Sequence, residues 1–269
     1  MSLKQIELDP QTRDFYCQAI DVLQQARMPF LIGGTFAFER YTGIARQTKD
    51  LDIFVHPQDV ERTLKIFSQA GYDTELSVSH WLGKAFRDRH NIALIFNWAT
   101  GEIAVDDMWF ERAITDRVLG IPVQLCPPEE MMWMGAFVMA RDRFDGADIA
   151  HLILTCSDRL DWQHLLTRFD NHWRVLFSHL ILFGFIYPGE RSRIPTWVMY
   201  NLSQRLQLET NNAPPQEKLC QGTLLAPLQY QTDVEQWGYK DARIRPTGNL
   251  IQPQIAQWTN HLKDEKGMT

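Results

Sequence analysis

The sequence predicts an α+β fold in two parts: a mixed sheet flanked by helices over residues 1–126, and a mostly helical domain over residues 127–269. Segments with the two-residue period of strands intermix with segments of helical period in the first part. The character of the chain changes at the C-P-P segment of residues 126–128. From Glu129 to about Leu208 the apolar residues follow a helical period.

The first elements are predicted from their apolar spacing and their breaks. Residues Thr12–Arg27 carry one apolar helical stripe, which consists of Phe15, Ala19, Val22, Leu23 and Ala26. The run Phe30–Ile32 ends in Gly33-Gly34 and indicates a strand that feeds a tight turn. Thr35 is expected to cap the short helix that follows.

The later elements alternate between strand and helix up to the C-P-P segment. A helix is expected to begin at Pro57 and to end by Gly71. Strands are expected at about residues 73–79, 84–87, 91–96, 117–119 and 122–125.

In the second part, breaks between helices are expected near residues 145–146, 158 and 188–189, and a linker is expected at residues 210–218. The apolar run at 175–187 is shorter than the ~20 residues that cross a bilayer and is expected to form a buried helix.

Composition excludes several classes of protein. A hydrophobic content of 45% and a charged content of 22% are those of a globular chain. The net charge of −6 argues against an extended nucleic-acid partner. The polar first residues do not resemble a secretory signal, and no membrane association is expected. The dispersed cysteines (Cys17, Cys126, Cys156 and Cys220) fit a reducing compartment, so we expect a cytoplasmic protein.

The segment K-D-L-D-I-F-V at residues 49–55 is the main candidate for a catalytic site. Its alternation places Asp50 and Asp52 on one face of a strand, roughly 6–7 Å apart at the backbone. Carboxylates in this arrangement can converge on one Mg²⁺ (or Mn²⁺), a hard cation that prefers oxygen ligands. The Gly33-Gly34 turn ahead of a helix would let a phosphate approach the backbone. An edge strand with a polar face and a plain turn would show the same spacing.

Three more residues are candidates for nucleotide binding. Arg46 and Lys49 could neutralise a triphosphate, although a solvated loop explains them slightly better. Thr35 could contact a phosphate instead of capping its helix. These residues join Gly33 and Gly34 as the predicted nucleotide-binding set, beside Asp50 and Asp52 as the predicted catalytic and metal-binding pair.

The segments L-I-G-G-T-F-A and R-Q-T-K-D-L-D-I-F-V resemble the G-[GS]…D-x-D signature of the DNA polymerase β-like nucleotidyltransferase superfamily. They resemble more closely a group of bacterial nucleotidyltransferase-like proteins of uncertain substrate. The likeness continues through H-N-I-A-L-I-F-N-W, C-P-P-E-E, R-F-D-G-A-D-I-A-H-L and W-G-Y-K-D-A-R, so it covers nearly the whole chain. It implies a nucleotidyltransferase-type first domain and a metal-dependent transfer of a nucleoside monophosphate.

Two positions depart from what the resemblance implies. The superfamily usually places a third carboxylate on a later strand, where it positions a second metal and the attacking hydroxyl, but this chain has Ala93 at that point. Asp106 and Asp107 lie a few residues beyond and could substitute, or could simply start a helix. Relatives are also expected to carry a lysine where this chain has Gly135.

We therefore expect an enzyme that moves a nucleoside monophosphate from a nucleoside triphosphate to an acceptor hydroxyl. The acidic balance favours a small molecule or a protein as the acceptor. Because of Ala93 and Gly135, the alternative is a catalytically degenerate module that binds a nucleotide or a partner. A component of a toxin–antitoxin pair is a third hypothesis, which rests on analogy alone.

Overall fold

The computed structural model describes residues 8–265 and 267. Contacts within the chain divide it into two compact units. The first comprises residues 1–127 with 243–269, and we call it the sheet unit. The second comprises residues 128–242, and we call it the helical unit.

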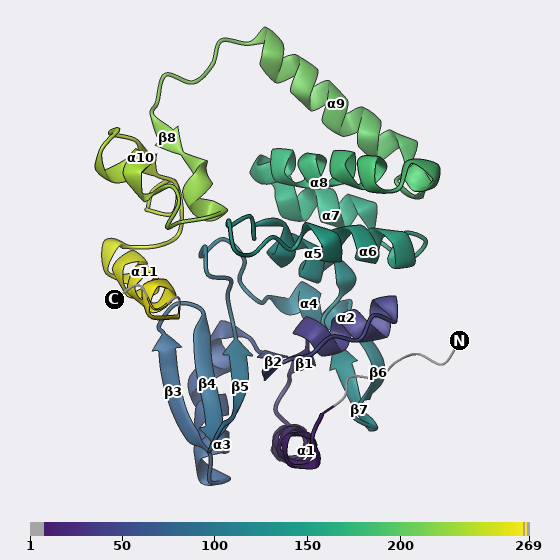
Figure 1. Cartoon of the computed structure of the whole chain (residues 1–269), viewed down its shortest axis with the longest axis vertical. Coiled ribbons are helices and arrows are strands. Elements are labelled where there is room, and N and C mark those ends of the chain that lie inside the picture. Colours follow the sequence, from purple (N-terminus) through teal and green to yellow (C-terminus); the bar gives the residue numbers. More distant parts are fainter. Residues whose placement is uncertain (1–7, 266, 268–269) are drawn as a thin grey trace. The chain divides into compact units, whose positions relative to one another are not determined.

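The sheet unit is built on a mixed sheet (Figure 1). Its strands are β1 (Leu31–Ile32), β2 (Asp50–Phe54), β3 (Asp73–Val78), β4 (Leu82–Arg87), β5 (His90–Ile95), β6 (Ile114–Val118) and β7 (Ile121–Leu125). Their order is β3-β4-β5-β2-β1-β7-β6. β2 is parallel to β5 and β1 is parallel to β7, whereas the other neighbours pair antiparallel. The predicted mixed sheet is confirmed, with β2 in its centre.

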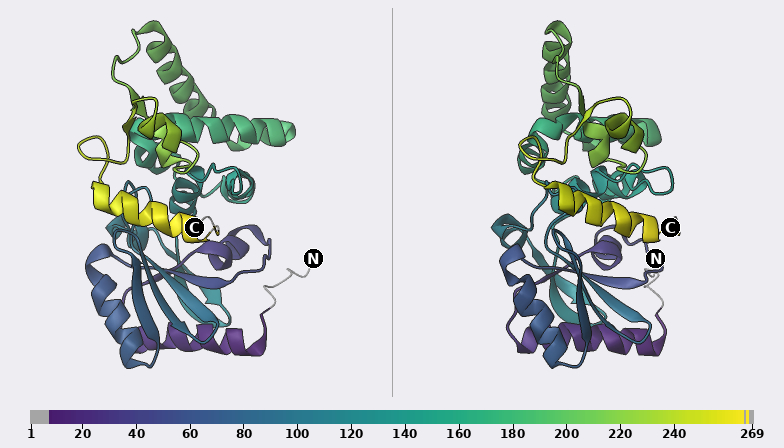
Figure 2. Two further views of the ribbon diagram at one scale, coloured as in Figure 1. Left: turned by 60° about the vertical axis from the view of Figure 1, so that its left-hand side comes forward. Right: turned by 90° about the vertical axis from the view of Figure 1, so that its left-hand side faces the viewer.

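Helices flank this sheet, and α1 (Pro10–Gln25) and α3 (Val60–Gln69) lie beside each other (Figure 2). The described helices of the sheet unit are α1 (Pro10–Gln25), α2 (Gly34–Thr42), the 3-10 helix η1 (Pro57–Asp59), α3 (Val60–Gln69), α4 (Asp107–Glu111) and α11 (Gln252–Glu265). A β-carbon added to Gly83 would lie 3.4 Å from Leu64 of α3. Gly83 pairs with Leu94, and Leu94 pairs with Ile53. Since paired residues share a face, α3 covers the face of the sheet that carries Ile53.

Helix α1 buries a slightly different stripe from the predicted one. Its buried residues are Phe15, Tyr16, Ala19, Ile20 and Leu23. The stripe is therefore shifted toward Tyr16 and Ile20, and Val22 is left half-exposed. The helix begins where the Asp9 carboxylate accepts a hydrogen bond from the Thr12 amide at 3.0 Å.

The helical unit is built almost entirely of helices, as the sequence predicts. Its described helices are α5 (Pro128–Ala136), α6 (Gly146–Cys156), α7 (Trp162–Phe169), η2 (Asp170–His172), α8 (Trp173–Ile186), η3 (Pro188–Arg193), α9 (Thr196–Asn211), η4 (Gln221–Leu224) and α10 (Gln231–Glu235). The short strands β8 (Leu219–Cys220) and β9 (Lys240–Asp241) pair parallel. The predicted breaks near residues 145, 158 and 188 all separate helices.

The described residues from 243 to 265 depart from the predicted domain boundaries, because they pack with the sheet unit. The Gln257 side chain accepts hydrogen bonds from the Ser79 amide at 3.1 Å and the Ser79 hydroxyl at 2.7 Å. The Trp258 ring is buried, with its centroid 6.1 Å from that of His80. The aromatic residues of this segment predict burial, but their spacing does not reveal which surface they cover.

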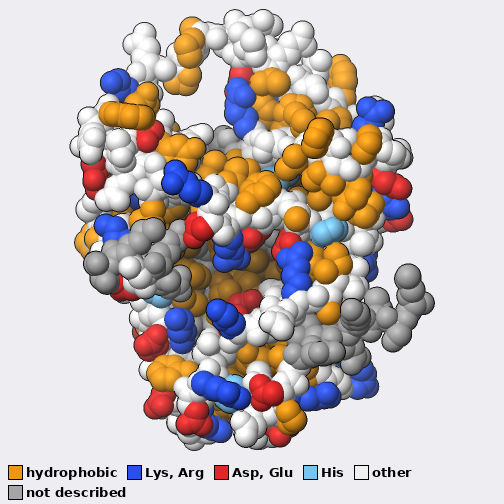
Figure 3. All heavy atoms as spheres, in the orientation of Figure 1, with side chains coloured by type: hydrophobic (Ala, Val, Ile, Leu, Met, Phe, Trp, Pro, Cys, Tyr) orange, Lys and Arg blue, Asp and Glu red, His pale blue; other side chains and the backbone are white. Residues whose placement is uncertain are grey.

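Helix α8 is less buried than its apolar sequence predicts. Its Phe185 side chain is 82% exposed and its Ile181 side chain is 54% exposed. Trp197 and Tyr200 of α9 are exposed as well, and Figure 3 shows hydrophobic side chains gathered over these two helices. None of the helices in the described residues combines the length and hydropathy needed to span a bilayer.

Candidate active site

Asp50 and Asp52 lie on β2 with the alternation that their spacing predicts. Leu51 and Ile53 are fully buried, whereas both aspartates are half-exposed on the opposite face of the sheet. The Thr48 hydroxyl donates a hydrogen bond to the Asp50 carbonyl oxygen at 2.8 Å and steadies the entry to the strand. The two carboxylates therefore face away from the layer formed by α3.

The Gly33-Gly34 turn lies directly against Asp52. The Gly33 amide donates a hydrogen bond to the Asp52 carbonyl oxygen at 3.0 Å. Gly34 has a φ of +52°, and a β-carbon on it would overlap the Oδ2 of Asp52. A β-carbon on Gly33 would overlap the ring of Phe54. Both glycines are thus required by close approach, and the Asp52 carboxylate lies against the first residue of α2.

The predicted capping role of Thr35 is wrong. Helix α2 begins at Gly34, and its N-cap residue is Gly33, which has no side chain that could accept a capping hydrogen bond. Thr35 therefore lies inside the first turn of the helix. The first helical residue is Gly34, which has a left-handed φ of +52°, two residues before the start that a threonine cap at residue 35 would give. At the other end of the helix, the Tyr41 hydroxyl donates to the Cys126 carbonyl oxygen at 2.9 Å and anchors α2 to the end of β7.

Arg46 and Lys49 lie on the segment that leads into β2. The Arg46 guanidinium stacks over the Phe38 ring, 4.4 Å from its centroid. The Lys49 side chain is exposed, and its carbonyl oxygen accepts a hydrogen bond from the Asn91 side chain at 3.3 Å. Asn91 is the residue that pairs with Asp50 across β2 and β5. Contact of either cation with a nucleotide stays a prediction.

The position beside Asp52 is occupied by Ala93. The parallel pairing of β2 with β5 sets these two residues opposite each other. On the far side of Ala93, the antiparallel pairing of β5 with β4 places Lys84 in the same row. Residue 93 therefore supplies no third carboxylate beside Asp52, and among the described residues no group of three or more His, Cys, Asp or Glu side chains could hold a metal ion.

Asp106 and Asp107 start a helix, which is the simpler of the two predicted roles. The Asp106 carboxylate accepts a hydrogen bond from the Met108 amide at 3.1 Å and caps α4. Asp107 Oδ1 lies 3.0 Å from His56 Nε2. Trp109 of the same helix contacts Phe54, with ring centroids 5.4 Å apart, so α4 covers the end of β2 on the aspartate face.

Tyr16 is coupled to the aspartate pair, and sequence reasoning did not identify it. Burial raises the pKa of the Tyr16 phenol, and the negative charges of Asp50 and Asp52 raise it further. The raised pKa keeps the Tyr16 phenol protonated. The only sequence signal would have been its place one residue after Phe15 on the buried stripe of α1, and a core tyrosine gives the same signal.

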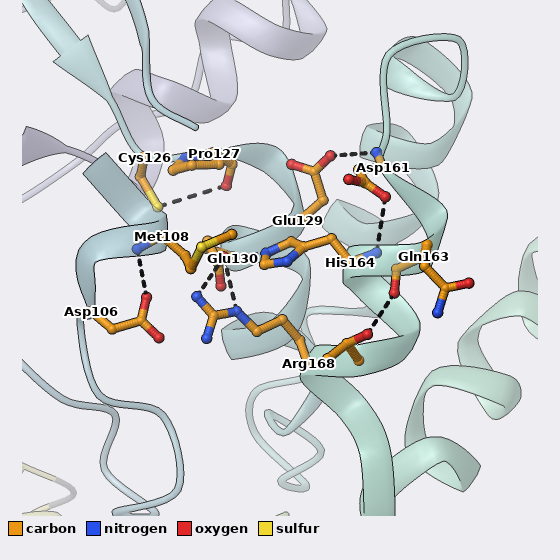
Figure 4. A network of polar contacts seen from close by, with 11 residues as sticks. Asp106, Met108, Cys126, Pro127, Glu129, Glu130, Asp161, Gln163, His164 and Arg168 are labelled. Carbon is orange, nitrogen blue, oxygen red and sulfur yellow. Dashed lines mark hydrogen bonds and ion pairs between the residues drawn. The ribbon is translucent and has the colours of Figure 1, made fainter. Parts of the chain in front are cut away.

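In the helical unit, the two glutamates that follow the C-P-P segment bind neighbouring helices (Figure 4). The fully buried Glu130 Oε1 lies 2.7 Å from His164 Nε2 and 3.0 Å from an Arg168 nitrogen. The Glu129 carboxylate accepts a hydrogen bond from the Asp161 amide at 2.7 Å. Burial raises the pKa of the Glu129 carboxyl. These contacts join α5 to α7, so the two glutamates are parts of the unit's core.

Gly135 lies in α5, and a β-carbon there would meet Asp145 and Ile149 at 3.8 and 3.9 Å. Both distances are ordinary van der Waals contacts, so the backbone itself does not require a glycine. The lysine that the resemblance implies is absent from this position.

Several solved structures are similar to this chain at low identity. The antibiotic-resistance factor ANT(2'')-Ia is 15% identical, with 64% of this chain and 98% of that chain covered and a TM-score of 0.46. The lincosamide antibiotic adenylyltransferase LnuA is 14% identical, with 55% and 98% covered and a TM-score of 0.39. An antigenic nucleotidyltransferase-like protein from Paracoccidioides brasiliensis is 16% identical, with 65% and 94% covered and a TM-score of 0.37.

No curated protein matches the sequence. A family model does match, and it spans residues 24–182, which include the glycine turn, both aspartates and the helices α5 to α7. This family is described as uncharacterised nucleotidyltransferase. The match covers more than half of the chain, and the chain therefore belongs to this nucleotidyltransferase family.

Proposed function

We propose that this protein is a metal-dependent nucleotidyltransferase that moves a nucleoside monophosphate from a nucleoside triphosphate to an acceptor hydroxyl on a small molecule or a protein. The observation that carries the proposal is the contact between the Asp52 carboxylate and Gly34 at the start of α2. It brings an anionic metal ligand and the backbone amides of a helix N-terminus to one place, which are the two groups that a metal-bound triphosphate needs.

The donor set fits one Mg²⁺ or Mn²⁺ ion. Asp50 and Asp52 supply hard oxygen ligands from one face of β2, and Mg²⁺ sites commonly use one or two carboxylates with water and substrate phosphates. When bound, such an ion neutralises charge on the phosphate oxygens of the nucleotide. The two aspartates would hold it, and the Gly33-Gly34 backbone would let the phosphates approach α2.

The transfer itself is a displacement at the α-phosphorus. The acceptor oxygen forms a bond to this phosphorus while the bond to the bridging oxygen of the β-phosphate breaks. Pyrophosphate leaves with the electron pair, and the hydroxyl proton passes to water. In this reaction the residues of the chain would contribute position and charge: α2 would orient the phosphates, and Asp50 and Asp52 would hold the metal ion.

Release of pyrophosphate from a nucleoside triphosphate tests this proposal. With Mg²⁺ and a mixture of small-molecule hydroxyl acceptors, the parent protein is expected to release pyrophosphate and Asp52→Asn is expected to release almost none. Asp21→Asn, at an exposed position on α1, is the matched control and should behave as the parent does. Equal rates in the parent and Asp52→Asn would contradict the proposed site.

The second candidate function is a binding module without catalysis, and the observation that favours it is Ala93 opposite Asp52. A parent protein that binds nucleoside triphosphate and Mg²⁺ together but releases no pyrophosphate would support this alternative.

A further inference from the structure

One row of side chains crosses four strands on the aspartate face of the sheet. The pairing of β2 with β5 aligns Asp52 with Ala93, and the pairing of β5 with β4 aligns Ala93 with Lys84. Glu75 of β3 ends the row. Because paired residues project from the same face, with β-carbons about 5 Å apart between neighbours, the lysine is separated from Asp52 by one methyl group.

Lys84 is half-buried and has no partner of its own in the part of the chain that the structure describes. The neighbouring Glu75 carboxylate accepts a hydrogen bond from the Ser77 hydroxyl at 2.6 Å and makes no ion pair with this lysine. An ammonium group that is partly removed from water without an opposite charge is unfavourable. A bound anion would remove this cost.

We propose that Lys84 binds the phosphate groups of the nucleoside triphosphate and supplies the positive charge that a second metal ion supplies in a site with three carboxylates. This inference rests on the proposed function and names a further residue of the same site. Three carboxylates with two divalent ions carry the same formal charge as two carboxylates with one divalent ion and one lysine. Ala93 and Lys84 therefore form a matched pair: the alanine removes a ligand, and the lysine replaces the ion that this ligand would hold.

The geometry of the row suits this role. Lysine carries a compact charge on a flexible stem of four carbons, so it can reach across the small Ala93 side chain toward the aspartate face. Lys65 provides the contrast, because it is exposed on α3, on the side of the sheet that carries Ile53. Only the lysine on the aspartate face is expected to contact a nucleotide.

The experiment is calorimetric binding of a non-hydrolysable nucleoside triphosphate to the full chain, with Mg²⁺ and with a chelator. Lys84→Met, which keeps the stem and removes the charge, is expected to weaken binding at least about tenfold in both conditions, the loss expected for one charge-assisted hydrogen bond. Lys84→Arg should retain most of the affinity, and the control Lys65→Met should bind within about twofold of the parent. Thermal unfolding of each variant shows whether it is folded.

The outcomes separate this inference from the proposed function. If the parent and Lys84→Met bind the nucleotide equally well, with binding still strengthened by Mg²⁺, the role of Lys84 is refuted while the proposed function stands. If Lys65→Met loses as much affinity as Lys84→Met, the effect is one of net charge, and the role of Lys84 is again refuted. If Lys84→Met binds weakly and retains the strengthening by Mg²⁺ that Asp52→Asn loses, the lysine and the metal act separately, as proposed.

Discussion

The Oδ2 atom of Asp52 occupies the space that a β-carbon on Gly34 would need. Gly34 also has a left-handed φ of +52°, so an L side chain is excluded on two grounds. The aspartate and the helix that begins at Gly34 are consequently held together by a glycine that has no substitute. This relationship joins the two predicted halves of the site, the carboxylate pair and the phosphate-binding turn.

Gly34→Ala should therefore damage the site and the fold together. The left-handed backbone alone costs about 1–2 kcal/mol for an alanine, and the new methyl group must displace the Asp52 carboxylate. We expect a lower midpoint in thermal unfolding and a loss of Mg²⁺-dependent nucleotide binding. Gly189→Ala is the control, since a β-carbon there meets no atom within 4 Å. Equal effects of the two substitutions would contradict the account of Gly34.

Restoring a carboxylate at residue 93 tests the row of side chains across the sheet. Ala93→Asp would lie between Asp52 and Lys84, its partners in the pairing of the strands. An opposite-charge pair across strands contributes about 0.2–1 kcal/mol. We expect a double-mutant cycle of Ala93→Asp with Lys84→Met, measured by chemical unfolding, to show a favourable coupling of this size. A coupling of zero or of the opposite sign would mean that Lys84 does not face residue 93.

The buried ion pair of the helical unit should be sensitive to the loss of one partner. Glu130 is fully buried, and Arg168 is its cationic neighbour on α7. Arg168→Met leaves the carboxylate with His164 alone and should destabilise the protein by about 3 kcal/mol in chemical unfolding. The exposed pair of Lys240 and Glu217 gives a control, and Lys240→Met should cost less than about 1 kcal/mol. Similar losses from both substitutions would refute the distinction.

Buried His179 predicts a dependence of stability on pH. Its Nε2 lies 3.1 Å from the Ala136 carbonyl oxygen, and burial lowers the pKa of its imidazole below the ordinary value. In the window between the folded and unfolded pKa values, the unfolded chain binds more protons, so stability is lost as the pH falls below about 6.5. Thermal unfolding of the parent should shift to lower temperature on acidification, and His179→Gln should reduce this shift.

Glu129 has the opposite effect on the pH dependence of stability from His179. Its raised pKa means that the folded chain binds more protons there, so its contribution favours the folded state at lower pH. The comparison of the parent with His179→Gln isolates the histidine, since Glu129 is present in both. An identical pH dependence of the two proteins would show that His179 does not contribute.

Local patterns were sufficient to predict the parts of the site that lie close in the sequence. The alternation of Asp50 to Ile53 determines a strand and its two faces, and a glycine pair after an apolar run determines a turn. The starting residue of α2 was missed because it depends on the φ of Gly34, which the residue type permits but does not dictate. The close approach of the Asp52 carboxylate to Gly34 becomes visible only in the three-dimensional structure.

The pairing of β2 with β5 could not be predicted in the same way. Asp52 and Ala93 are forty-one residues apart, and the register of parallel strands depends on the whole sheet and not on a turn between them. A single lysine in an alternating strand, such as Lys84, carries no signal until its neighbours in the sheet are known. Residues 243–269 pose the same problem, because Trp258 predicts burial without naming its partner His80.

In the proposed site, Asp52 couples metal binding to nucleotide binding. Calorimetric titration of a non-hydrolysable nucleoside triphosphate, with Mg²⁺ and with a chelator, measures that coupling directly in the parent and in Asp52→Asn. Because substrate phosphates complete the coordination of Mg²⁺ at a site with two carboxylates, the parent should bind nucleotide at least about tenfold more tightly with the metal, a gain of about 1.4 kcal/mol. Asp52→Asn should lose most of this gain. If Asp52→Asn binds the nucleotide and Mg²⁺ as well as the parent does, the site is elsewhere.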